Sequence, residues 1–277
     1  MSGRRCRIST STSTDASTSI DTELAFSKAR LRVSRSGLRS IISDLQSASP
    51  IALRPIDDEG RLSRVAIAQS SASLLAEDSV QLFVVVEPGA ELELFEVSAT
   101  IAYPSPSVGA ADPIRQLLHV TVMDGATLIL DEQPLIVAEG SELRRLTLLN
   151  LHAGARCLHR ETLVLGRHGE QAGVASVRTR VLREGRPVLD DTLDTTAPLR
   201  ALRSMAMLMD ARCIASVGLW GWPPIGDPSA VTFAISDRDT VARRLGIDAP
   251  SALKPLDRLW DAWRDQLRAP VEDVVAE

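Results

Sequence analysis

The feature that most constrains the fold is a series of short β-rich segments separated by turns that contain glycine. Gly125, Gly140 and Gly154 are 15 and 14 residues apart, and each precedes Ala or Ser. Glycine supplies the positive φ that tight turns need, and the segments between these turns are rich in residues that favour strands. This weak repeat predicts a meander, a sandwich or a stacked β-solenoid, and the spacing alone does not separate the three. A parallel α/β architecture is disfavoured because no helix-length pattern lies between the strands.

The segment from Leu151 to Glu170 carries the most chemistry. It is predicted to open with a turn from His152 to Ala155 and to continue as a strand that ends in Gly166-Arg167, because the side chains after the turn alternate between two faces with a period of two. An ionised carboxylate is costly to bury without a partner, so Glu161 among apolar neighbours is hard to explain by packing alone. One face of this strand carries Cys157, His159, Glu161, Leu163 and Leu165, and the other carries Leu158, Arg160, Thr162 and Val164.

The bulk composition excludes several classes of protein. The formal net charge is -5 and the basic residues are spread along the sequence, which argues against a nucleic-acid-binding surface. No run approaches the ~20 apolar residues of a membrane span. Cys6, Cys157 and Cys213 lie far apart and form no CxxC pair. This cysteine usage indicates a reducing compartment, so a cytoplasmic protein without a membrane partner is predicted.

The chain divides into three parts. Residues 1–22 are dominated by Ser and Thr and are expected to be a disordered tail, because they cannot bury enough apolar surface to fold. Residues 23–270 are predicted to form a single β domain that includes its C-terminal helices, and residues 271–277 a frayed tail. Within the domain, Leu24 to Val33 and Gly37 to Ser47 each fit either a helix or a strand.

Two C-terminal α-helices are predicted. The first begins at Ser236, an N-cap with Asp239 three residues on, and ends at Gly246, a natural C′ residue. A Met-rich segment, residues 199–214, could form a further helix. The second C-terminal helix ends at Pro270 and places on one face Leu256, Leu259, Trp260, Trp263 and Leu267.

Conventional catalytic and metal motifs are missing from the sequence. It contains no GxSxG, no GxxxxGK[ST] and no GxGxxG. Cys157 and His159, with His152 nearby, are too few ligands for a structural zinc site, so no stably bound metal is expected.

A carboxylate pair is one alternative. Asp190 and Asp191 are adjacent in a strand and therefore face opposite ways, but either could pair with Glu161. Glu161 and Asp191 could then serve as the acid pair of a carbohydrate-active β-solenoid enzyme, with Trp220 and Trp222 lining its cleft. Only 3% of the residues are aromatic, which argues against a sugar-binding platform.

Five segments in order resemble a known family. They are Arg54-Pro55; SSASLLAEDSVQL with Asp78; VEPGAELELFEVSATIAY with Ala99, Thr100 and Tyr103; LILDEQPLIVAEGSELRR with Gln133, Ile136 and Arg144 or Arg145; and HRETLVLGRHGE with Glu161, Gly166, Arg167, Gly169 and Glu170. Together they resemble the UreD (UreH) family of urease accessory proteins, from Arg54 to about Leu193. Family glycines are replaced by Ala72, Ser73, Ala76 and Glu77, and a family lysine by Ile101, so the chain is identified as a diverged member.

The resemblance implies a non-enzymatic scaffold with a β-helix-like body of stacked strands. Proteins of this family bind UreF and, through it, the GTPase UreG, and they dock on the urease apoprotein so that nickel reaches its active site. A water-filled passage is the proposed nickel route, and its polar positions match Asp78, Thr100, Glu161 and Asp191. Oxygen ligands suit a hydrated divalent ion in transit, whereas Cys/His clusters would trap it. Transient nickel and no stably bound cofactor are therefore expected.

Overall fold

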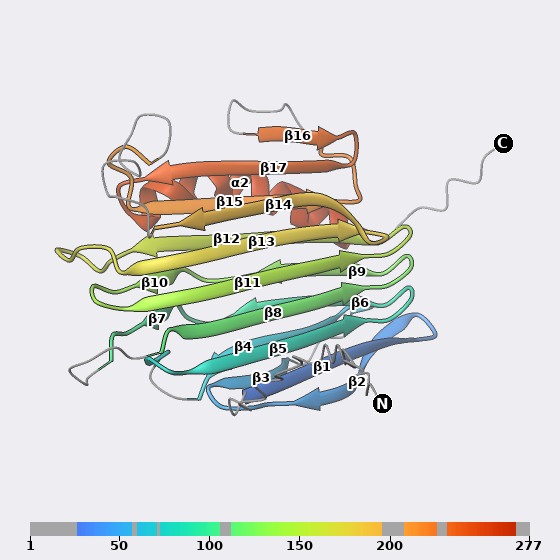
Figure 1. Ribbon diagram of the computed structural model, residues 1–277. Helices are drawn as coiled ribbons and strands as arrows, with labels where there is room; N and C mark the ends of the chain where they lie inside the picture. The colour runs from blue at the N-terminus through green and yellow to red at the C-terminus, as the bar shows by residue number, and fades with distance from the viewer. Residues whose placement is uncertain are drawn as a thin grey trace, which may run out of the picture.

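The computed structural model describes residues 27–56, 60–70, 73–105, 112–195, 208–225 and 232–269. These residues form two β-sheets packed face to face, with a helix on the outside of one of them (Figure 1). The predicted mainly β fold is confirmed. The predictions of terminal tails at residues 1–22 and 271–277 lie outside the described residues.

The first sheet, sheet A, follows the spatial order β14-β13-β11-β8-β5-β1-β2. Strands β1, β5, β8, β11 and β13 are parallel, and β2 and β14 pair antiparallel at the two edges. The strands are β1 (Ser27–Ser36), β2 (Arg39–Gln46), β5 (Ser79–Val86), β8 (Ile114–Val122), β11 (Glu142–Leu151), β13 (Val174–Arg183) and β14 (Arg186–Asp194). The two segments that fitted either helix or strand are therefore β1 and β2.

The second sheet, sheet B, follows the order β16-β17-β15-β12-β9-β6-β4-β3, with two short strands, β7 and β10, beside β12. Strands β4, β6, β9 and β12 are parallel. The strands are β3 (Ile51–Ile56), β4 (Ser63–Gln69), β6 (Glu91–Glu96), β7 (Thr100–Ala102), β9 (Thr127–Asp131), β10 (Leu135–Val137), β12 (Arg156–Leu165), β15 (Cys213–Trp220), β16 (Thr232–Ser236) and β17 (Asp239–Gly246).

The chain coils by crossing alternately between the sheets, so the stacked solenoid is the correct one of the three predicted alternatives. A coil runs from β8 in sheet A to β9 and β10 in sheet B and back to β11 in sheet A. The turns stack: the amide of Gly89 donates to the carbonyl of Asp124, and that of Gly125 to the carbonyl of Ala153, both at 2.9 Å. Gly140 lies in the turn that returns the chain to sheet A, at the opposite end of the strands from Gly125 and Gly154. The 14–15 residue spacing of these glycines therefore corresponds to half a coil.

The inward side chains of the strands form three layers between the sheets. At the end of the Gly125 turn, an apolar layer includes Val86, Val122 and Leu151. At the other end, a second apolar layer includes Ile114 and Leu143. The inward positions between them on β8, β11 and β12 are polar, and this middle layer contains the candidate site.

The second predicted C-terminal helix is confirmed as α2 (Ala249–Arg268). Asp248 is its N-cap and forms a capping box with Ser251. Its apolar face, which includes Trp260 and Trp263, packs on the outer face of sheet B.

The first predicted helix is wrong, because residues 239–246 form β17. The Ser236 hydroxyl donates to Asp239 at 2.8 Å and closes the turn between β16 and β17, so the residues that resemble a helix cap instead close a hairpin. Pairing with β15 and cover from α2 outweigh the helical pattern. Residues 199–207 of the Met-rich segment lie outside the described residues, and Cys213 begins β15.

Candidate functional site

A layer of polar side chains crosses the interior between the two apolar layers. On β11, the inward residues read Leu143, Arg145, Thr147 and Leu149, so the polar pair is enclosed by leucines. Strand β12 follows the same pattern, with His159 and Glu161 between Cys157 and Leu163. Because neighbouring strands are in register, these positions stack along the axis of the solenoid.

Arg145 is the centre of this polar layer. It is 7% exposed and pairs with Glu132, which is 4% exposed. It also donates to Thr147 Oγ1 at 3.3 Å and to Gln116 Oε1 at 3.4 Å. Buried charges need partners of this kind, because an unpaired ion in a protein interior is strongly unfavourable. The guanidinium is therefore fixed between the two sheets.

His159 extends the network on the sheet B side. Its Nε2 lies 2.9 Å from the second oxygen of Glu132. Burial lowers the pKa of His159 below its usual value of 6.5, with Glu161 acting in the opposite direction. The ring is therefore neutral at neutral pH and can donate a single proton to Glu132.

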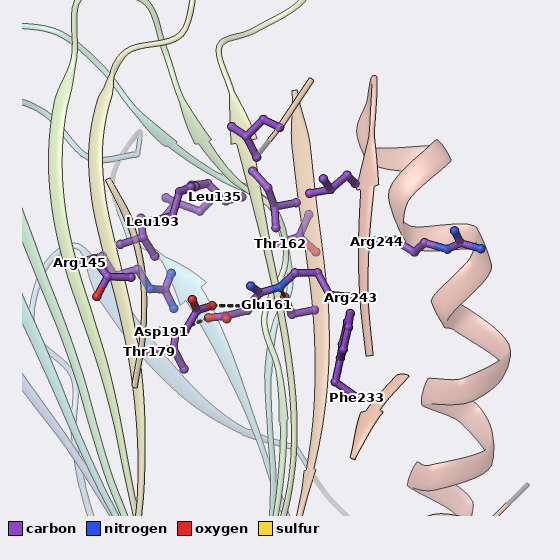
Figure 2. Close-up of a pocket in the computed structure, with 17 residues that line it drawn as sticks. Leu135, Arg145, Glu161, Thr162, Thr179, Asp191, Leu193, Phe233, Arg243 and Arg244 are labelled. Carbon is purple, nitrogen blue, oxygen red and sulfur yellow. Dashed lines mark hydrogen bonds and ion pairs between the residues drawn. The ribbon is translucent and has the colours of Figure 1, made fainter. Parts of the chain in front are cut away.

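A cavity of about 640 Å³ opens where the polar layer reaches the C-terminal end of the solenoid. Glu161 accepts a hydrogen bond from the Thr179 hydroxyl at 2.8 Å. Asp191 on β14 pairs with Arg243 on β17, and Arg243 Nε donates to Ser216 Oγ at 3.0 Å. Figure 2 shows Asp191 and Arg243 reaching toward each other from opposite sheets, with Glu161 beside them.

A smaller cavity, about 40 Å³, lies on the other side of Arg145. Its polar lining includes Gln69, Glu96, Thr100 and Gln116, and Gln69 donates to the Thr100 hydroxyl. Burial raises the pKa of Glu96 to about 7, although Arg145 acts to lower it. Arg145 lines both cavities, so it marks the boundary between two parts of one polar interior.

Comparison with known proteins decides the family. A family described as UreD urease accessory protein matches residues 26–275. The chain is 34% identical to urease accessory protein UreD 1 of Streptomyces griseus over 229 residues, which cover 82% of this chain and 88% of the relative. The chain belongs to the UreD family. It is also 31% identical to urease accessory protein UreD 1 of Saccharopolyspora erythraea over 228 residues, which cover 79% and 87% of the two chains.

Three of the four residues that the UreD resemblance assigns to the passage line these cavities. Thr100 lies at the smaller cavity, and Glu161 and Asp191 lie at the larger one. Asp78 lies elsewhere, in the turn before β5, where its Oδ2 accepts a hydrogen bond from the amide of Leu75 at 2.7 Å. The structure therefore brings Glu161 and Asp191 to one cavity, places Thr100 at the neighbouring cavity and places Asp78 in a turn.

The UreD motif residues near Gly166 build a surface loop. Arg167 Nε donates to Glu170 Oε1 at 2.8 Å, and the guanidinium stacks on the Tyr103 ring at 5.4 Å. The hydrogen bond from Arg167 holds the pKa of Glu170 at about 2. Gly169 lies in the same loop with a φ of +80°.

Arg54 and Pro55, which begin the UreD resemblance, lie far along the sequence from that loop. Both are exposed on the edge strand β3. An edge position suits proline, because its missing N–H removes no hydrogen bond from inside the sheet.

Sequence reasoning missed much of the polar layer in this UreD-family chain. Glu96, Glu132 and Arg243 were not singled out, and Arg145 was named only as one of two possible matches to a family arginine. The alternation of inward and outward positions along β11 indicates that Arg145 points inward, because Leu143, Thr147 and Leu149 share its face of the strand. Glu132 follows β9 in a loop, so no periodic pattern predicts its direction.

The residues considered for a metal site have three different environments. Cys157 lies in the apolar core, where burial raises the pKa of its thiol, and His159 binds Glu132. His152 lies in an outer turn, 3.7 Å from Asp124. The part of the chain that the structure describes contains no group of three metal-ligating side chains.

The acid pair considered for sugar chemistry lacks its tryptophans. Glu161 and Asp191 do share the larger cavity. Trp220 is 1% exposed in the core, and Trp222 stacks on Arg156 at 4.8 Å, so neither lines the cavity. Phe233 is the aromatic residue among its described lining.

Among the described residues, no helix has both the length and the apolar character needed to cross a membrane. The helix in that part of the chain is α2, and it is amphipathic. One face packs on sheet B, and the other carries charged side chains such as Asp261 and Arg264.

Proposed function

We propose that this chain is a cytoplasmic urease accessory scaffold, without catalytic activity of its own. In this proposal it docks on the urease apoprotein together with UreF and UreG, and its interior carries Ni²⁺ toward the urease active site. Membership of the UreD family supports the link to urease. The observation that carries the nickel route is the polar layer between the sheets, which opens into a cavity holding Glu161 and Asp191.

The chemistry of this layer suits an ion in transit. Carboxylate, hydroxyl and amide oxygens bind divalent ions more loosely than thiolate or mixed Cys/His sites do. Each of two acids already has a cationic partner, since Glu132 pairs with Arg145 and Asp191 pairs with Arg243. A passing ion must compete with these arginines, which favours its release over trapping.

The test replaces both acids of the larger cavity, with Glu161→Gln and Asp191→Asn in one chain. Apo-urease, UreF, UreG and Ni²⁺ are combined with wild-type or variant chain, and nickel bound to urease is measured over time alongside urease activity. We expect nickel loading to be at least fivefold slower, with unchanged co-purification of UreF and urease.

The matched control is Asp261→Asn, which removes an exposed carboxylate on α2, on the outside of sheet B. It is expected to load nickel at the wild-type rate. If the double variant also loads at that rate, the nickel route through this cavity is wrong. If instead the double variant no longer co-purifies with UreF or urease, its acids act in docking.

A further inference from the structure

The outer face of sheet A lacks the cover that sheet B has. Helix α2 packs on the outside of sheet B, against β12, β15 and β17. Within the described ranges, no element packs on the outside of β5, β8 and β11. In Figure 1 these strands face the viewer and α2 lies behind β15. Parallel sheets are usually covered on both faces, so this open parallel face is a candidate surface for a partner.

The centre of this outer face is apolar. Strand register places Leu117 of β8 beside Leu146 of β11, and one row further along it places Phe83 of β5 beside His119 and then Leu148. These side chains are partly exposed, whereas the residues between them on each strand point into the core. The result is an apolar strip that runs across three adjacent strands.

Basic side chains border the strip on both sides. Arg30 of β1 is in register with Phe83, and Arg180 of β13 is in register with Leu148. At one end of the strip, Arg115 and Arg144 lie directly opposite each other on neighbouring strands. Like charges in such cross-strand positions repel each other.

Two of these arginines lack an acidic partner among the described residues. Arg144 pairs with Glu142 at 3.0 Å and Arg180 pairs with Asp190 at 3.1 Å, but Arg30 and Arg115 make no ion pair with any described residue. A hollow of about 310 Å³ lies at this end of the face, between Arg115, Arg144 and Arg178. Arginines without an acidic partner therefore border an apolar strip, although the chain as a whole carries a net charge of -5. Such a surface is complementary to a partner that carries carboxylates.

The size of the face fits one side of a protein interface. The five parallel strands of sheet A lie ~4.8 Å apart, and about seven residues along each strand, at ~3.3 Å per residue, span this region. Width and length together give an area of roughly 550 Å². A standard interface buries about 800 Å² on each partner, so this face would supply most of that area.

We propose that the outer face of sheet A is the surface on which this chain docks to the urease apoprotein. The contact surface on urease would carry apolar side chains between carboxylates. This inference rests on the proposed function, since it assigns a surface to the docking step, but it does not depend on nickel passing through the interior.

The test reverses the charge of the two unpaired arginines, with Arg30→Glu and Arg115→Glu in one chain. Because neither arginine has an ion pair among the described residues, the fold should be retained, and circular dichroism and the urea midpoint check this. The chain is purified with UreF and UreG, and its binding to immobilised urease apoprotein is measured over a range of salt concentrations. We expect at least tenfold weaker binding, and wild-type binding that weakens as salt rises.

The matched control reverses two arginines on the other side of the molecule, with Arg238→Glu and Arg258→Glu. Both are exposed, at the β16–β17 turn and on α2. The control should bind urease as the wild-type chain does. Equal binding by the test variant and wild type would overturn the inference, whatever the outcome of the Glu161 and Asp191 experiment.

Other occupants of the face give different results, and each overturns the assignment to urease. If the test variant no longer binds UreF but still binds urease, the face is the binding surface for UreF. If light scattering shows wild-type dimers that the variant lacks, the occupant is a second copy. If trypsin cleaves residues 1–26 faster in the variant while urease binding is unchanged, the chain covers its own face.

Discussion

Asp190 and Asp191 are neighbours in β14 but lie on opposite faces of sheet A. Asp190 receives two hydrogen bonds from Arg178 on the outside, at 2.7 and 2.6 Å, whereas Asp191 pairs with Arg243 inside the larger cavity. The pair formed by Asp191 connects sheet A to sheet B at the open end of the solenoid. Two adjacent carboxylates therefore have separate environments.

Replacing Asp191 by Asn should change the free energy of unfolding by about 1 kcal/mol or less, because its pair with Arg243 is partly solvated. The side chains of Asp191 and Arg243 are 37% and 33% exposed. Urea unfolding of Asp191→Asn and Asp190→Asn gives the comparison. A loss above 2 kcal/mol for Asp191→Asn alone would mean that this pair holds the two sheets together.

Replacing Arg145 by Met should be far more disruptive. It leaves the Glu132 carboxylate buried without its cation, which costs about 3–5 kcal/mol for pairs of this kind. The double variant with Glu132→Gln removes the stranded charge and should recover at least about 2 kcal/mol. Urea unfolding of both variants measures this difference, and a double variant no more stable than the single one would contradict it.

Glu96 should make stability depend on pH. Folding raises its pKa from 4.5 to about 7, so the folded state binds more protons between those values. Its contribution to the free energy of unfolding therefore falls as pH rises through this window. At 1.36 kcal/mol per pKa unit, a change from 4.5 to about 7 corresponds to a total fall of roughly 3 kcal/mol.

The measurement compares wild type with Glu96→Gln by urea unfolding at about pH 5 and about pH 8, values that span most of the expected window. The wild type should lose stability relative to the variant at the higher pH. Glu87→Gln is the control, because the pKa of Glu87 is lowered by Ser34 and Arg32. A wild-type advantage that grows with pH would show that Glu96 is stabilised in its ionised form.

Two glycines of one loop should respond differently to replacement by alanine. Both have positive φ, +83° at Gly166 and +80° at Gly169. A Cβ at Gly166 would lie 2.4 Å from the carbonyl oxygen of Gln171, whereas one at Gly169 meets nothing within 4 Å.

Gly169→Ala should therefore cost about 1 kcal/mol, the conformational term alone. Gly166→Ala should cost at least about 2 kcal/mol more, since backbone must move. Equal losses in thermal or urea unfolding would refute the close approach.

Local patterns were sufficient to predict strand β12, the glycine turns and one helix. Alternation identified β12 and the direction of Cys157, His159 and Glu161, and the glycine turns at Gly125 and Gly154 were predicted from composition. Helix α2 was predictable because its apolar residues recur on one face and Asp248 caps it. These features depend on neighbours within a few residues, which a sequence displays directly.

The pairing of strands and the charge of the interior were decided only by the tertiary structure. Residues 239–246 carry a helical pattern, yet pairing with β15 makes them a strand. Glu132 and Arg145 are 13 residues apart and meet only because the coil returns from sheet B to sheet A. Asp191 and Arg243 meet across 52 residues. A buried charge is stabilised by a partner in space, and the chain order does not state which partner the fold will supply.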